Sequence, residues 1–345
     1  MAQELFDGQW GEPMNTMNTM EYKGYMAKRR AVRSKILLVV TLSLIYLVCL
    51  ANPAQAGEKF VSTTMATFLK LPVGARPTAL GGAFTGAADD ANALAVNPAG
   101  LSQLNYRQVI VSHHEWFLDN AYEYLGIVHP VPFGRLGTAG LSILYLNLGD
   151  FEGTYYRDAE AGIKAGQPAG DFTASNLSVT LSYSWQMRND TLAGLRLAFL
   201  RERLEEETAN GMSLDIGVLH RLNLVPGLII GITVKNMGPS IEFISRKGPL
   251  PFTIQAGASY RALGDDLLLT MDIVEPIDNE VGLHLGAEYR LFDTFIRVGY
   301  RKSDLGPGVT GGLGFKLTEN YRLDYAYIPF EDLGRTHALS LLAKF

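Results

Sequence analysis

The sequence predicts an all-β fold, a transmembrane antiparallel β-barrel of about 14 strands with an N-terminal helical plug. Three observations predict it. From Tyr106 onward, apolar and polar residues alternate with a period of two over segments of about ten residues, the length that a tilted strand needs to cross a bilayer. Every second connection between these segments is tight, and a stretch rich in glycine and alanine precedes them all.

The first 56 residues have the features of an export signal. Five basic residues between positions 28 and 35 precede an apolar run over 36–51, which is short for a spanning helix. Residues 54–56 (Ala-Gln-Ala) then form a cleavage pattern, with the cut between Ala56 and Gly57. We expect 1–25 to be a mis-assigned upstream extension and 26–56 a cleaved signal peptide. The alternative is a single N-terminal membrane anchor.

A stretch dense in glycine and alanine, residues 74–101, comes next. Small residues let a backbone pack very close to a neighbour. Asp89 and Asp90 are helix N-cap candidates before residues 91–96, and Pro98 suits the start of a further helical turn. We therefore expect residues 57–105 to form short helical turns that plug the lumen of a barrel built from residues 106–345.

Polar residues of this stretch are candidates for contacts with the barrel wall. We expect Asp89, Asp90 and Asn97 to hydrogen-bond lumen-facing arginines, and Arg76 to pair with a wall carboxylate. The alternative is that the two aspartates only cap a helix. The arginines considered are Arg297, Arg301 and Arg322. The plug motif comprises Gly74, Arg76, Gly81, Gly82, Asp89, Asp90, Asn97, Pro98, Ala99 and Gly100.

The strands follow from the alternation. In residues 177–186, for example, Leu, Val, Leu, Tyr and Trp occupy one face, and Ser, Thr, Ser, Ser and Gln the other. Strands are expected near 107–114, 122–130, 136–148, 175–187, 191–203, 211–222, 227–237, 252–263, 265–275, 280–291, 294–302, 308–317, 320–328 and 336–345.

The strands of a soluble sandwich also alternate apolar and polar residues. The lengths of the connections therefore distinguish a membrane barrel from a sandwich. The connections alternate between short turns and longer polar loops, such as 149–174, 204–210, 238–251, 303–307 and 329–335. Outer-membrane barrels have short periplasmic turns and longer outside loops, whereas Greek-key crossings give no reason for such regularity. Aromatic residues near strand ends, among them Tyr122, Tyr124, Trp185, Tyr289 and Tyr300, are candidates for interfacial girdles or ordinary strand aromatics.

The final strand places Leu341, Ala343 and Phe345 on one face. An apolar stripe that ends on an aromatic residue resembles the signal that outer-membrane barrels present to their insertion machinery. The alternative is the edge strand of a soluble sheet, which would leave an apolar stripe with unpaired backbone.

The order of motifs resembles a known family. Gly-Ala-Arg-Pro at 74–77, Gly-Gly-Ala-Phe at 81–84, Ala-Asp-Asp-Ala at 88–91 and Asn-Pro-Ala-Gly-Leu at 97–101 are similar to the N-terminal hatch of the PorV/PorQ family. These proteins are outer-membrane barrels related to the FadL transporters. Later segments, 234–238, 283–291 and 324–327, also resemble the family, so the similarity covers residues 61–345.

Composition and single residues exclude several functions. Residues 57–345 carry 24 basic and 31 acidic side chains, a net charge of −7, which argues against nucleic acid as a partner. The only cysteine, Cys49, lies in the signal, which excludes thiol catalysis in the mature chain. His113 and His114 would point to opposite faces of a strand, so they cannot bind one metal together. No cofactor or enzymatic motif is expected.

Two functions remain open at this point. The resemblance implies a barrel in the outer membrane of a Gram-negative-type bacterium that serves protein secretion or surface attachment, as in type IX secretion. Its partners would be outer-membrane lipid, the barrel-insertion machinery and a secretion translocon or exported proteins. The alternative is a FadL-like transporter with a hydrophobic ligand. The inward positions are mostly Ser, Thr, Gly and charged residues, which disfavours a fully apolar tunnel but leaves room for a local apolar pocket.

Overall fold

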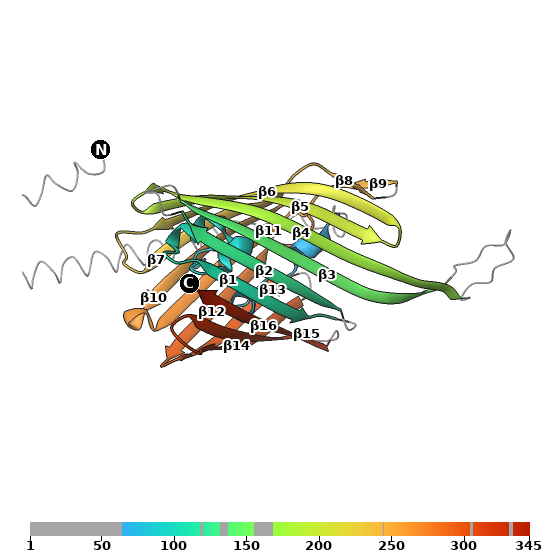
Figure 1. Ribbon diagram of the computed structural model, residues 1–345. Helices are drawn as coiled ribbons and strands as arrows, with labels where there is room; N and C mark the ends of the chain where they lie inside the picture. Colours follow the sequence, from blue (N-terminus) through green and yellow to red (C-terminus); the bar gives the residue numbers. More distant parts are fainter. Residues whose placement is uncertain are drawn as a thin grey trace, which may run out of the picture. The chain divides into compact units, whose positions relative to one another are not determined.

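The computed structural model describes residues 64–117, 120–131, 137–154, 168–243, 245–303, 306–330 and 334–345. Its main feature is a closed antiparallel barrel of fourteen strands, in which strands follow one another in chain order and β1 closes the ring against β16 (Figure 1). The predicted fold class is confirmed. The expected extension, signal peptide and cleavage site at Ala56 and Gly57 lie outside the described residues.

The barrel strands lie close to their predicted positions. They are β1 (Gln108–Glu115), β2 (Ala121–Pro130), β3 (Thr138–Thr154), β4 (Pro168–Arg188), β5 (Thr191–Leu204), β6 (Glu207–Arg221), β7 (Leu228–Met237), β10 (Thr253–Ala262), β11 (Leu267–Pro276), β12 (Gly282–Leu291), β13 (Thr294–Ser303), β14 (Gly306–Lys316), β15 (Tyr321–Phe330) and β16 (Gly334–Lys344). A 3₁₀ turn, η3 (Leu263–Asp265), joins β10 to β11.

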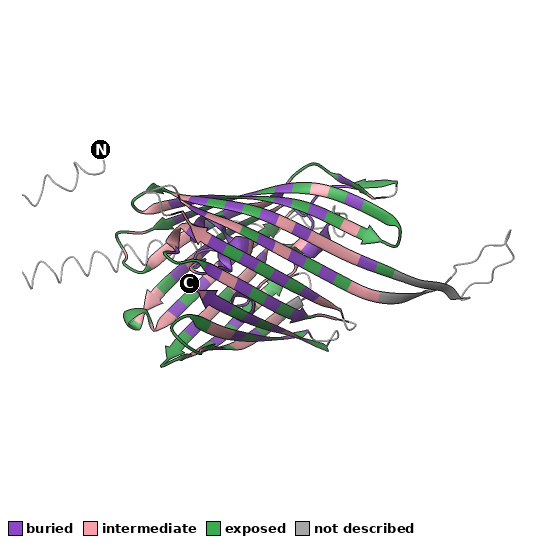
Figure 2. Cartoon of the chain, in the orientation of Figure 1, coloured by how far each residue is buried: buried purple, intermediate pink, exposed green. Residues whose placement is uncertain are grey.

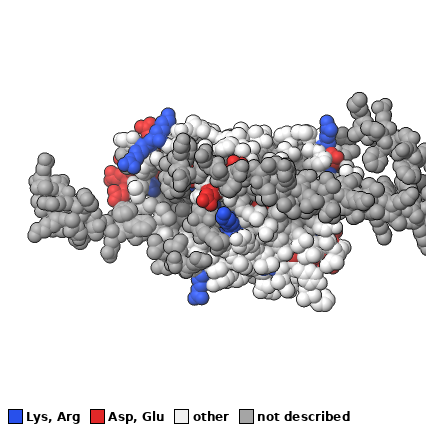
Figure 3. All heavy atoms as spheres, turned by 180° about the vertical axis from the view of Figure 1, so that it is seen from behind, with Lys and Arg blue, Asp and Glu red and all other residues white. Residues whose placement is uncertain are grey.

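The barrel is apolar outside and polar inside, the reverse of a soluble sheet. On β4, Ser178, Thr180, Ser182 and Ser184 are at most 5% exposed, whereas Leu181 is 62% exposed. Buried and exposed residues alternate along the strands in Figure 2. On the face in Figure 3, charged side chains gather at both ends of the wall, and a few lie between them. An outward apolar band is what a membrane-spanning barrel requires.

The two ends of the barrel differ. The turn end contains the start of β1 and the end of β16, where Gln108 pairs with Lys344. The loop end contains the connection 238–252, in which β8 (Ile241–Phe243) and β9 (Arg246–Gly248) form a separate hairpin. Ile241 is buried, and its side chain lies over Gly211 of β6.

The predicted regularity of the loops is wrong in three places. Residues 204–210, 303–307 and 329–335 were expected as longer loops, but the strands on either side continue into them. β5 ends at Leu204 and β6 begins at Glu207, so only two residues connect them. Polar, charged strand ends that extend beyond the apolar band have the composition of a loop, which is why the sequence misplaces them.

The aromatic girdle was also predicted too broadly. Tyr289 and Tyr300 are exposed on the outer face, as a girdle requires, but Tyr122 and Tyr124 are buried inside the barrel. Tyr122 stacks on His114 at 4.4 Å between ring centroids, and its hydroxyl donates to the Pro72 carbonyl at 2.6 Å. These two tyrosines face inward, where Tyr122 has a partner on the inner segment, and the sequence of one strand does not reveal that partner.

An inner segment, residues 64–104, precedes β1 and runs through the lumen. Its short helices are η1 (Thr67–Lys70), α3 (Ala75–Ala79), α4 (Ala93–Val96) and η2 (Pro98–Gln103). α3 contacts β13, β14, β15 and β16, and η2 contacts β3, β4, β5 and β6. Because these two sets of strands lie in different arcs of one closed ring, the segment that contacts both lies within it (Figure 1).

The inner segment passes from the loop end to the turn end. At the loop end, the Met65 amide donates to the Pro249 carbonyl at 2.9 Å, and the Thr64 hydroxyl bonds Asp278 at 2.5 Å. At the turn end, the Ser102 and Ser184 hydroxyls are 2.6 Å apart. The first described residues therefore lie at the end of the barrel opposite to the start of β1.

Candidate functional site

Small residues on both partners allow the inner segment to touch the wall. A Cβ added at Gly299 of β13 would lie 2.1 Å from the Gly81 nitrogen, and one at Gly194 of β5 would lie 2.4 Å from the Ala99 nitrogen. Gly81 itself has a φ of 67° and faces the Tyr300 backbone at a distance that leaves no room for a Cβ. The backbones therefore pack directly against each other.

The rest of the plug motif also lies in the lumen. Gly74 adopts a φ of 81°, and Gly82 a φ of 84° beside His284. Gly100 lies against the Ala88 carbonyl, where a Cβ would come within 2.0 Å. Pro98 begins η2, and the Asn97 side chain accepts a hydrogen bond from the Ala99 amide. All are buried.

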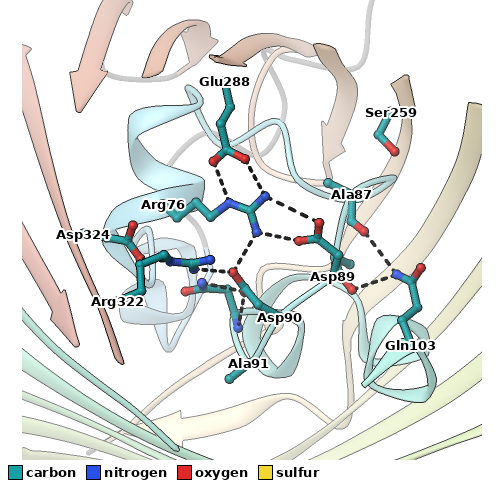
Figure 4. A network of polar contacts seen from close by, with 12 residues as sticks. Arg76, Ala87, Asp89, Asp90, Ala91, Gln103, Ser259, Glu288, Arg322 and Asp324 are labelled. Carbon is teal, nitrogen blue, oxygen red and sulfur yellow. Dashed lines mark hydrogen bonds and ion pairs between the residues drawn. The ribbon is translucent and has the colours of Figure 1, made fainter. Parts of the chain in front are cut away.

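Arg76 is the centre of a charged network near the turn end (Figure 4). Its guanidinium binds Glu288 of β12 through Nε and Nη2, both at 2.8 Å. Its Nη1 lies 2.5 Å from Asp89 and 2.7 Å from Asp90. Arg76 is only 4% exposed, so a buried side chain of the inner segment is joined by a bidentate pair to the wall.

The wall supplies the remaining members of the network. Arg322 of β15 binds Asp90 at 2.6 Å and Asp324 at 2.8 Å. Arg297 of β13 binds Glu288 at 2.6 Å and Asp324 at 2.8 Å. Arg261 of β10 also pairs with Asp89. Four arginines thus balance four carboxylates, the condition under which buried charge is tolerated.

The two inner-segment residues at the centre are held in their charged forms. Burial acts to raise the pKa of Asp90, but the guanidinium groups of Arg76 and Arg322 outweigh it, so that pKa lies far below its usual value. Burial alone would lower the pKa of Arg76, yet Asp89, Glu288 and Asp90 raise it well above its usual value. Arg76 and Asp90 are therefore both charged at neutral pH.

Some of the expected contacts are present and others are not. Arg76 meets a wall carboxylate and Asp90 meets Arg322, as predicted. The Asn97 amide instead donates to the Thr85 and Val218 carbonyls, and Arg301 lies over the Phe330 ring. Neither aspartate caps α4, since its N-cap is Asn92, which has no side-chain cap.

The wall partners Glu288 and Arg261 were missed. Each occupies a polar position within an otherwise regular alternation, so the sequence marks them as lumen-facing. It cannot show that they lie at the height of Arg76.

An apolar chamber of about 540 Å³ opens near the loop end. Its apolar surface comes from the inner segment and from strand ends, and the strands contribute hydroxyl groups. The sequence had left room for a local apolar pocket of this kind. Apolar residues that line it are Leu69, Leu71, Pro72, Val73, Trp116, Phe117, Leu144 and Val274; wall hydroxyls are Ser142, Ser178 and Thr180; charged residues are Lys70, Arg196, Lys235, Glu280, Arg301 and Lys302.

A β-bulge shapes one side of the chamber. The register of β6 against β7 shifts between Leu214 and Ile216, so Lys235 and Asn236 together oppose Asp215. Asn236 takes a φ of 59°, and its backbone N–H donates to the Asp215 carboxylate at 2.7 Å. Lys235 and Asn236 both line the chamber. Two consecutive polar residues within an alternating strand are a signal in the sequence that could have predicted the bulge.

No helix in the described part of the chain is both long and apolar enough to span a bilayer.

His113 and His114 do face opposite sides of β1, since His113 is exposed beside Glu123 whereas His114 is buried. The described ranges contain no group of three or more His, Cys, Asp or Glu residues placed to hold a metal.

A family model matches residues 45–249, more than half of the chain. The chain belongs to the uncharacterised protein family UPF0164. A search of curated protein sequences finds no match for this UPF0164 chain.

Solved structures share the fold of this UPF0164 barrel. The Ralstonia pickettii toluene transporter TbuX is 13% identical with a TM-score of 0.59, covering 79% of this chain and 98% of its own. The Pseudomonas putida toluene transporter TodX is 14% identical with a TM-score of 0.57, covering 79% and 96%. A FadL homologue from Pseudomonas aeruginosa is 12% identical with a TM-score of 0.50, covering 83% and 99%.

These structures agree with the FadL-like part of the predicted resemblance, and the fold resembles outer-membrane proteins of Gram-negative bacteria. TbuX and TodX are transporters by name, rather than enzymes. The finer assignment to the PorV/PorQ family stays a prediction, as does the insertion signal, of which Leu341 and Phe345 are exposed while Ala343 is 9% exposed.

Proposed function

We propose that this UPF0164 barrel is an outer-membrane channel for hydrophobic small molecules. The observation that carries the proposal is the chamber at the loop end, whose volume of about 540 Å³ falls in the usual range for small-molecule sites. Its apolar lining includes Leu69, Leu71 and Val73, which belong to the inner segment. A ligand in the chamber would therefore touch the segment that fills the lumen.

The proposal favours transport over the secretion role expected from the sequence. Barrels of similar fold include channels named for toluene and for monoaromatic hydrocarbons. That likeness supports a shared architecture, and the chamber supports a shared kind of ligand. Partnership with a type IX translocon or with exported proteins has no comparable observation in its favour.

Two neighbouring substitutions on β4 test the proposal. Thr180 is buried and lines the chamber, so Thr180→Phe should fill part of it. Leu181 faces outward, so Leu181→Phe is the matched control. Uptake of radiolabelled toluene is measured in cells with equal amounts of folded barrel in the outer membrane. We expect Thr180→Phe to remove most of the protein-dependent uptake and Leu181→Phe to retain it.

Three outcomes would contradict the proposal: no protein-dependent uptake by the unmodified barrel, uptake unaffected by Thr180→Phe, or equal loss in both variants. Recovery of a translocon or an exported protein with the native barrel, together with absent uptake, would favour the secretion role instead.

A further inference from the structure

A group of titratable side chains interrupts the apolar outer face where the ring closes. The strands β16, β1 and β2 are neighbours there (Figure 1). His113 of β1 and Glu123 of β2 are directly opposite each other, and their side chains are 47% and 55% exposed. Glu115, on the same face of β1, is also exposed and lies opposite His337 of β16. We call these four residues the seam patch.

The seam patch lies at the edge of the apolar band, toward the loop end. Tyr145 of β3 lies opposite Glu123, and Tyr327 of β15 lies opposite His337. Both tyrosines are exposed, as residues at a bilayer interface are. Toward the turn end, the next outward residues on β1, β2 and β16 are apolar and exposed: Val111, Leu125 and Leu339. The patch therefore borders directly on surface that faces lipid.

The side chains of the seam patch satisfy one another only in part. His113 Nδ1 lies 2.6 Å from Glu123 Oε1, and His337 Nδ1 lies 2.7 Å from the Tyr325 hydroxyl. Within the described ranges, the Glu115 carboxylate has no hydrogen-bond or ion-pair partner. A carboxylate beside hydrocarbon is costly unless a donor accompanies it. We therefore expect a donor from outside this chain at Glu115.

The composition of the seam patch makes it complementary to a second copy of itself. Two barrels inserted in the same direction are related by an axis along the bilayer normal, so surfaces at equal height meet. Glu115 and Glu123 are acceptors, whereas the imidazoles of His113 and His337 can donate. In a two-fold contact, a residue of one copy meets a different residue of the other, and the same pair forms twice. A patch with only one sign of charge would instead repel its copy.

We propose that the seam patch is the contact surface between two copies of this chain in the outer membrane. The Glu115 carboxylate of one copy accepts from an imidazole of the other, and the outward leucines beside the patch, Leu125 and Leu339, pack across the contact. The inference goes beyond the proposed function and does not depend on it.

Cross-linking through single cysteines tests the contact. Cys49 is the only cysteine, so Cys49→Ser gives a background without thiols. Leu339→Cys places a thiol beside the patch, because Leu339 is outward and opposite His113. Ile254→Cys is the matched control, since Ile254 is outward, near the loop end, on the opposite arc of the ring.

The yield of dimer linked by a bis-maleimide is measured on gels for barrels in lipid vesicles. The measurement is repeated after a ten-fold increase in the lipid content. We expect Leu339→Cys to keep most of its yield, whereas random encounters of Ile254→Cys should fall by about ten-fold by mass action.

Removal of the carboxylates tests the patch itself. In the Leu339→Cys background, the double change Glu115→Leu and Glu123→Leu removes both acceptors and leaves a wall that suits lipid. Each exposed pair contributes little alone, but the two-fold axis repeats it. The dissociation constant of the dimer should therefore rise by about ten-fold. The control is Glu275→Leu, because Glu275 is an outward carboxylate of β11 that lies opposite Ile254; it should leave the yield unchanged.

Three outcomes would overturn the inference and leave the proposed channel intact. The first is equal loss of linked dimer from Leu339→Cys and Ile254→Cys on dilution, which would mean that lipid headgroups or water cover the patch. The second is a yield that the double change does not alter. The third is an equal decrease in yield with Glu275→Leu, which would mean that the seam patch has no special role.

Discussion

At the scale of single residues, the charged network explains how an arginine of the inner segment can be buried. Arg76 makes two hydrogen bonds to Glu288, two to Asp89 and one to Asp90. Removing one member would leave its buried partners with an unbalanced charge, which costs more than a single pair contributes. The network therefore gives the segment one strongly preferred position against the wall rather than simply adding stability.

The acid sensitivity of the network should depend on Asp90. Because its folded pKa lies far below the usual value, its contribution to stability is complete above the unfolded pKa of about 3.9 and is lost as pH falls toward the folded pKa. We expect the difference in unfolding temperature between the unmodified barrel and Asp90→Asn to stay constant from pH 8 to 5 and to shrink below pH 4. Intrinsic fluorescence in detergent measures both temperatures, and a difference that disappears already at pH 6 would contradict the assignment.

At the scale of elements, close approach of backbones decides where the inner segment lies. The three atoms nearest to a Cβ added at Gly299 of β13 belong to Leu80, Gly81 and Thr310. Side chains larger than hydrogen cannot be accommodated there without moving one of two backbones. Glycine in a strand often marks such an approach.

Gly299→Ala tests this packing. Since the clash is with backbone atoms, we expect a loss of roughly 1–3 kcal/mol in the free energy of unfolding, the usual cost of overpacking. Gly311→Ala on β14 is the control, because the nearest atom to its added Cβ lies 3.8 Å away. Denaturant titration of refolded barrels compares them. Equal midpoints for the two variants would mean that the inner segment does not press on β13.

Much of the element scale could be predicted from the sequence. Alternation located all fourteen barrel strands, because a strand between lipid and a polar lumen must alternate along its whole length. It failed where that constraint ends. The hairpin β8–β9 lies within the predicted loop 238–251, and β6 begins at Glu207 within another. Strand pairing beyond the apolar band has no such pattern to reveal it.

Within the candidate site, the glycine-rich stretch predicted which part of the chain lies inside, and Arg76 and Asp90 were identified as wall contacts. The chamber was not located. Its surface combines Leu71 and Val73 of the inner segment with Trp116 at a strand end and Lys235 at a bulge. Those residues are far apart in the chain, and nothing local indicates that they converge.

At the scale of the whole molecule, the apolar outer surface requires lipid around the barrel. Leu181 is 62% exposed, and Tyr183 on the same face is 43% exposed. Leu181→Lys should therefore destabilise the barrel in lipid vesicles by roughly 2–4 kcal/mol, as lysine does near the bilayer midplane. Gln186→Lys, a polar position on the same strand, should have little effect. Urea titrations in vesicles measure both, and equal stability of the two variants would argue that Leu181 does not face lipid.

The alternation and the small-residue stretch were sufficient to predict a closed membrane sheet with an inner segment, because both follow from local demands of lipid and of close packing. The partners of Arg76, the inward turn of Tyr122 and the exposure of Lys235 to the chamber depended on the folded barrel. Each arises when residues distant in the chain reach the same height in the lumen, and that height is set by strand register and by a bulge at Asn236.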